Sequence, residues 1–208
     1  MKEIMGKNFI GPEELETIAA SFPIQKITSP IPELPFSLDV LKNIKDDYIL
    51  ILGVLFDRAG NPLTLLSLRS LYGLDPAVKE PCFYNQDWYV KEAFAAETHL
   101  NFQWYLIKKE VIAETRAQDP KIIAEAFKKG EQFPSAILVA YTFFAYYCLY
   151  NELLWNNDFI WCSDTDHNGD RIYVGRYTDP NKINKNGFNI HRHLSLRQAY
   201  GFVPEIKA

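Results

Sequence analysis

Cysteine is scarce in this chain of 208 residues, which has only Cys82, Cys148 and Cys162 and no CxxC pair. An odd number of scattered cysteines fits neither a disulfide framework nor a zinc-ligand pattern, and it is typical of a reducing compartment. Residues 1–10 also lack the apolar segment of a secretion signal. Together these absences lead us to expect a cytoplasmic protein.

The motifs of the best-known enzyme classes are missing as well. The chain contains no GxSxG, HExxH, Walker A or GxGxxG pattern, which removes the usual sequence support for a hydrolase, a zinc protease or a nucleotide-dependent enzyme. There is no internal repeat with a period of about 20–50 residues and no low-complexity segment. The sequence leaves both an enzyme and a binding protein open.

Long uncharged runs are also rare, and the longest covers residues 133–151 (FPSAILVAYTFFAYYCLYN). Pro134 is expected to start a helix, which leaves about 17 residues, or about 25 Å, against a hydrocarbon core of about 30 Å. The run also holds four tyrosines, whose hydroxyls are costly to bury in lipid. We therefore expect no membrane span but a buried core helix, with an apolar partner interface as the alternative.

The composition is that of a globular protein, with 48% hydrophobic and 23% charged residues. A formal net charge of −4 argues against a surface that coats nucleic acid, so a nucleic-acid partner is not expected. The charge is uneven, however, because residues 171–208 hold seven Lys or Arg and two acids. This basic segment predicts either a phosphate-binding face or a tail docked on an acidic body.

The first 36 residues are predicted to be an N-terminal extension, followed by a single domain over residues 37–208. A short helix is expected over residues 11–21, with acids in its first turn. Four prolines within the next residues exclude a regular helix and a central strand: Pro23, Pro30, Pro32 and Pro35. An extended proline-rich arm is therefore predicted.

Hydrophobic periodicity and capping residues predict the elements of the middle of the chain. The expected helices cover residues 38–46, 62–72, 87–97, 120–129 and 134–154, and the expected strands cover residues 48–56 and 100–106. The strands do not alternate regularly with helices, so a doubly wound parallel sheet is not expected.

In the last third of the chain, hydrophobic residues recur with the two-residue period of strands. Residues 159–166 and 170–177 flank Asn168-Gly169, and Asn-Gly between strand-like runs predicts a hairpin with a type I′ turn. A second Asn-Gly precedes residues 188–194, so a three-stranded antiparallel meander is expected. The fold class is thus α+β, with a mixed, mainly antiparallel sheet of about five strands and helices packed largely on one face.

The turn of the first hairpin resembles the start of an EF-hand calcium loop. Asp164, Asp166 and Asn168 provide oxygen atoms at alternate positions, and a glycine occupies the sixth position. The resemblance ends there, because the twelfth position, which needs a glutamate, holds Gly175. A turn stabilised by local hydrogen bonds from Asp and Asn explains the same residues.

His191 and His193 stand two residues apart on the last expected strand, so both imidazoles are predicted to share one face. Two histidines and a carboxylate suit a divalent transition metal. The predicted metal ligands are Asp164, Asp166, Asn168, His191 and His193. A divalent metal is thus the one cofactor that the sequence suggests, and two half-exposed histidines are the alternative.

Residues 83–89 (FYNQDWY) mix aromatic rings with amide and carboxylate groups, a combination that suits ligand recognition by stacking and hydrogen bonding. The same pattern arises where aromatic residues attach a loop to the core. The predicted ligand-binding residues are Tyr84, Asp87, Trp88, Arg176 and Arg192. Arg197 and Tyr200 are further candidates for a phosphate contact.

Three hypotheses of function follow. The first is a non-catalytic binding protein with a protein or small-molecule partner, which requires none of the missing motifs. The second is a metal-assisted hydrolase or phosphotransfer enzyme built on the C-terminal meander. The third is the binding of nucleic acid or of a phosphate-bearing ligand by the basic segment. The first is preferred and the second is the main alternative.

Overall fold

The computed structural model describes residues 1–179 and 186–207. Within these residues the chain forms seven α-helices and two mixed sheets of five and four strands. Most strand pairs are antiparallel, so the α+β class is confirmed. The strands form two sheets where the sequence predicted one sheet with a meander, because the strands at residues 48–52 and 104–108 pair with each other and not with the meander.

The five-stranded sheet has the order β1-β2-β3-β9-β4. Its strands are β1 (Phe9–Ile10), β2 (Tyr48–Leu52), β3 (Trp104–Lys108), β4 (Glu131–Gln132) and β9 (Glu205–Ile206). The antiparallel pair of β2 and β3 forms the centre, with Leu50 opposite Leu106. β9 comes from the far end of the chain and lies between β3 and β4.

The four-stranded sheet has the order β7-β6-β5-β8. Its strands are β5 (Phe159–Thr165), β6 (Arg171–Tyr177), β7 (Gly187–His191) and β8 (Tyr200–Gly201). β5, β6 and β7 form the predicted antiparallel meander. β8, which was not predicted, pairs in parallel with β5.

The turn between β5 and β6 differs from the predicted type I′ turn. Gly169 has a φ of 84°, but Asn168 is not among the non-glycine residues with positive φ in the described chain. The Asp166 carboxylate accepts hydrogen bonds from the backbone N–H groups of Asn168 and Asp170, at 2.9 Å each. These bonds stabilise a turn in which only the glycine needs the left-handed conformation.

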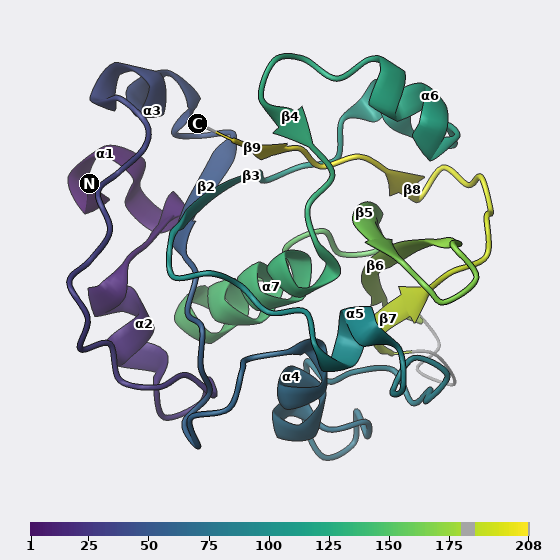
Figure 1. Ribbon diagram of the computed structural model, residues 1–208, viewed down its shortest axis with the longest axis horizontal. Coiled ribbons are helices and arrows are strands. Elements are labelled where there is room, and N and C mark those ends of the chain that lie inside the picture. The colour runs from purple at the N-terminus through teal and green to yellow at the C-terminus, as the bar shows by residue number, and fades with distance from the viewer. Residues whose placement is uncertain (180–185, 208) are drawn as a thin grey trace.

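Helix α7 (Ala136–Tyr150) lies between the two sheets, as Figure 1 shows. Ser135 caps its first turn by accepting a hydrogen bond from the Leu138 N–H. The side chains of residues 136–146 are all buried, and the Tyr141 hydroxyl donates to the Leu52 carbonyl at the end of β2. The prediction of a buried core helix is confirmed. In the described residues, no helix is long and apolar enough to cross a membrane.

The N-terminal residues belong to the same hydrophobic core as the rest of the chain. This segment contains α1 (Lys2–Met5), the 3₁₀ helix η1 (Gly6–Asn8), β1 and α2 (Pro12–Ile18). Ile10, Leu15 and Phe22 are fully buried in the core that α7 also occupies. The proline-rich arm follows, and the Trp104 indole N–H donates to the Pro32 carbonyl at 2.9 Å. The core is therefore continuous across the predicted boundary at residue 36.

The remaining helices are short. They are α3 (Leu38–Ile44), α4 (Leu65–Tyr72), α5 (Ala93–Ala96), α6 (Pro120–Glu125) and the 3₁₀ helix η2 (Ala113–Thr115). The helix predicted over residues 87–97 is wrong for its first half, where only turns occur. There the Gln86 amide and the Trp88 indole both donate to the Ile190 carbonyl of β7, which ties this segment to the sheet.

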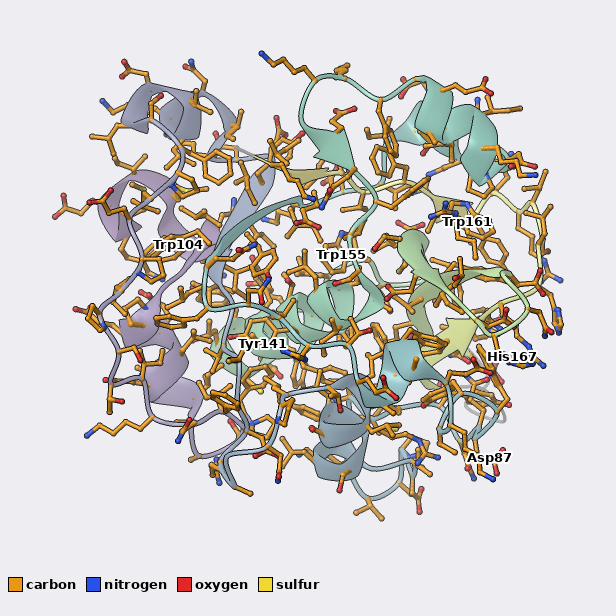
Figure 2. The ribbon with its side chains drawn as sticks, viewed as in Figure 1. Asp87, Trp104, Tyr141, Trp155, Trp161 and His167 are labelled. Atoms are coloured by element: carbon orange, nitrogen blue, oxygen red, sulfur yellow. The ribbon has the colours of Figure 1, made fainter. Side chains whose placement is uncertain are left out.

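The two faces of the four-stranded sheet pack against different parts of the chain. On β5, Ile160 and Cys162 point into the main core, while Phe159 and Trp161 belong to a second hydrophobic cluster on the outer face. That cluster also includes Ile123 of α6, and Trp161 lies on the side of β5 that faces α6 (Figure 2). The cluster leaves part of the outer face uncovered.

Candidate functional site

Asp166 organises the turn between β5 and β6. Its side chain is fully buried and, besides the two turn N–H groups, accepts a hydrogen bond from the Arg192 guanidinium at 3.2 Å. Burial alone favours the protonated carboxyl, but these hydrogen bonds outweigh it and lower the pKa of Asp166 below its ordinary value. The carboxylate is therefore occupied by protein donors.

This lowered pKa leads to a prediction of acid sensitivity. An Asp with a depressed folded-state pKa adds stability above its unfolded pKa of about 3.9, and this stability is lost as the pH falls through the folded pKa. Asp166→Asn is expected to lower the free energy of unfolding by about 1–3 kcal/mol at pH 7, and by less at pH 3. Urea unfolding at both pH values measures this.

The matched control is Asp39→Asn, because the Asp39 side chain is 92% exposed. This variant is expected to change the free energy of unfolding by no more than about 0.5 kcal/mol at either pH. An Asp166→Asn variant as stable as the original protein at pH 7 would contradict the role assigned to the buried carboxylate.

Asp164 points away from that turn, toward the start of α7. Its carboxylate accepts a hydrogen bond from the Ala136 N–H at 2.6 Å. Burial raises the pKa of Asp164, although this N–H group and Arg171 act in the opposite direction. Asp164 and Asp166 thus bind different segments of the chain.

His191 lies on the outer face of the sheet, where its ring stacks on Tyr173 with centroids 5.2 Å apart. The structure therefore does not bring the five predicted metal ligands to one point. Among residues 1–179 and 186–207, no three His, Cys, Asp or Glu side chains are grouped in a way that would hold a metal ion. The metal site and the hydrolase hypothesis built on it stay predictions.

The predicted ligand-binding residues are also dispersed. The Arg192 guanidinium lies 4.8 Å from the centre of the Trp88 ring, so these two residues contact each other. Arg176 forms an ion pair with Glu80 at 2.8 Å, and Asp87 lies at the edge of the molecule (Figure 2). Of these five residues, only Tyr84 lines a hollow on the outer face of the four-stranded sheet.

The uncovered part of the outer face forms a hollow of about 580 Å³. All four strands contribute to its floor, which consists of Phe159, Tyr173, Asn189, His191 and Tyr200. The rings contact one another, since the Tyr173 centroid lies 4.8 Å from that of Tyr200 and 6.1 Å from that of Phe159. The rings pack at an angle to one another, and only a small part of each is exposed. We call this floor and its rim together the aromatic hollow.

The rim of the aromatic hollow is more polar than its floor. It is formed by Tyr84, Tyr177, His193, Ser195 and Arg197. The Tyr173 hydroxyl donates to the His193 carbonyl at 3.0 Å, which attaches the rim segment to the floor. Burial raises the pKa of Tyr173, so its hydroxyl keeps its proton and acts as a donor. The hollow thus combines packed aromatic rings at its floor with hydrogen-bonding groups at its rim.

The sequence prediction missed Phe159, Tyr173, Tyr177, Asn189 and Ser195. The signal was the two-residue period of the strands, because alternate side chains of a strand share one face. That period places Tyr173 and Tyr177 on one face of β6 and aligns them with His191 on β7, since Tyr173 pairs with His191. Applying it across all three meander strands would have grouped Phe159, Tyr173, Tyr177 and Asn189, whereas Ser195 lies outside these strands.

Comparisons with protein-family models, with curated proteins and with solved structures gave no match for this chain. The functional argument therefore rests on the geometry of the aromatic hollow.

Proposed function

We propose that this protein is a non-catalytic binding protein that takes a small ring-shaped ligand in the aromatic hollow. The observation that supports the proposal is a hollow lined mostly by aromatic residues of four strands, with a volume within the range of small-molecule sites, about 300–1,000 Å³. Aromatic faces bind planar rings by stacking and sugar rings by contact with their C–H groups. The proposal needs no metal and no catalytic motif.

Several polar groups would orient such a ligand. Asn189 is only 2% exposed, and its amide N–H donates to the Gly187 carbonyl, so the side chain is held in one orientation at the floor. Ser195 adds a hydroxyl group at the rim. A small number of fixed polar groups within an apolar site gives orientation and specificity.

A thermal-shift series tests the proposal. The panel is adenosine, uridine, indole and glucose, which cover planar and non-planar rings. At about 100 times its dissociation constant, a ligand that binds only the folded state stabilises it by about 2.7 kcal/mol. At least one compound is expected to raise the melting temperature, and Tyr177→Ala is expected to weaken its binding about tenfold because a stacking surface is lost.

The control is Phe56→Ala, since Phe56 is 37% exposed and Tyr177 is 40% exposed. Phe56 does not line the aromatic hollow, so this variant should bind as the original protein does. A panel without any shift, or a shift that Tyr177→Ala leaves unchanged, would argue against ligand binding at this place.

A further inference from the structure

The described lining of the aromatic hollow contains basic side chains and no acidic ones. Its ten lining residues include Arg197, His191 and His193, and none of them is an acid. Two carboxylates of the same sheet region are paired with other arginines, since Asp158 binds Arg116 at 2.6 Å and Asp166 binds Arg192. Within the described residues, the lining of the hollow therefore combines one guanidinium and several hydrogen-bonding side chains with no acidic side chain.

Arg197 stands over the floor from the rim. Its guanidinium lies 6.0 Å from the centre of the Tyr200 ring, and its Nε donates to the Ser195 hydroxyl at 3.3 Å. Within the described part of the chain, no ion pair includes Arg197 and its two Nη groups donate to no protein acceptor. Four N–H donors of one guanidinium are thus directed to solvent or to a ligand.

His193 provides a second donor on the same rim. The hydrogen bond from Tyr173 to its carbonyl fixes its backbone, while its side chain lines the aromatic hollow. A single arginine fork satisfies the two oxygens of a carboxylate, whereas the three oxygens of a phosphate group also accept from a further donor. Two donor side chains on one rim therefore match a phosphate better than a carboxylate.

We infer that the ligand of the aromatic hollow is a phosphate monoester of a ring compound, with its ring on Tyr177, which is 40% exposed, and its phosphate at Arg197 and His193. This inference rests on the proposed binding function and specifies its ligand class. A phosphate monoester carries a charge between about −1.5 and −2 at pH 7, which complements a lining without acids. Nucleoside monophosphates and sugar phosphates both belong to this class.

Matched pairs of compounds test the inference by isothermal titration calorimetry. The pairs are adenosine with adenosine monophosphate, uridine with uridine monophosphate, and glucose with glucose 6-phosphate. In at least one pair, the phosphorylated member is expected to bind about tenfold more tightly or better, because charge-assisted hydrogen bonds are added. Raising the salt concentration should weaken the binding of the phosphorylated compound and leave the affinity of the unphosphorylated compound unchanged.

Arg197→Ala is expected to remove the difference in affinity between the two compounds of the pair. Arg197→Lys is expected to keep part of this difference, because the positive charge remains. The control is Lys121→Ala on α6, which loses the same single charge at an exposed position outside the hollow. This control should preserve the full difference. Since Arg197 is exposed, its variants are expected to fold, and circular dichroism checks this.

The outcomes separate the two proposals. Equal affinity within every pair that binds would overturn the phosphate inference and leave the binding function standing. A difference that survives in Arg197→Ala would overturn the placement of the phosphate. Inorganic phosphate that binds as tightly as the phosphorylated compound would overturn the role of the ring. If neither member of any pair binds, and the wider panel of ring compounds gives no shift, both proposals fail.

Discussion

Replacing Gly175 by alanine is expected to lower the free energy of unfolding by about 4 kcal/mol or more, a loss that few single substitutions reach. A Cβ atom at this position would lie 2.0 Å from the Asp158 carbonyl oxygen and 2.8 Å from the Phe159 Cα. Both are backbone atoms, so relief requires a shift of the chain rather than a change of rotamer. Gly175 also pairs with Phe159 on one side and Asn189 on the other.

Thermal and urea unfolding of Gly175→Ala measure this effect. The control is Gly60→Ala, because Gly60 has a φ of 82° and no atom within 4 Å of an added Cβ. This variant carries only the strain of a left-handed alanine, about 1–2 kcal/mol. If the two variants were equally stable, the close approach of residues 158–159 to β6 would be contradicted.

Phe144→Ala is expected to cost about 3–5 kcal/mol, the range for a large aromatic side chain removed from a packed core. Phe144 is fully buried on α7, and its ring stacks on Tyr72 at 4.0 Å and on Phe83 at 5.1 Å. It also lies 5.7 Å from Phe188 of β7. Its removal would leave a cavity among four segments of the chain, which makes complete collapse of the site difficult.

Urea unfolding of Phe144→Ala, with Ile122→Ala as its control, gives the measurement. Ile122 is 57% exposed on α6, so truncation there is expected to change the free energy of unfolding by no more than about 0.5 kcal/mol. Phe144→Leu is expected to recover much of the loss because it refills most of the volume. A loss below about 1 kcal/mol for Phe144→Ala would contradict the packing described for α7.

The sequence predicted those elements whose signals are local. The apolar run of α7 and the strands around Asn168-Gly169 are properties of neighbouring residues, and these elements appear close to their expected bounds. The two-residue strands β8 and β9 have no comparable signal, because their conformation depends on pairing with β5 and β3.

The candidate site was harder to predict for a related reason. Trp88 and Arg192 each have the chemistry of a ligand contact, but they are far apart in the sequence and contact each other. A single sequence does not show which polar groups are already satisfied inside the protein. His191 and His193 were predicted to share one face of a strand, but β7 ends at His191, and the His191 ring stacks on Tyr173.

The position of β9 has a consequence for synthesis on the ribosome. β9 lies between β3 and β4, so the sheet that begins with residues 9–10 stays incomplete until residues 205–206 have emerged. At roughly 5–20 residues per second, the nascent chain would hold β3 with one open edge for several seconds. An open edge is a template for wrong strand pairing. Chaperone binding to the nascent chain would therefore be most useful at this edge, before translation reaches the last strand.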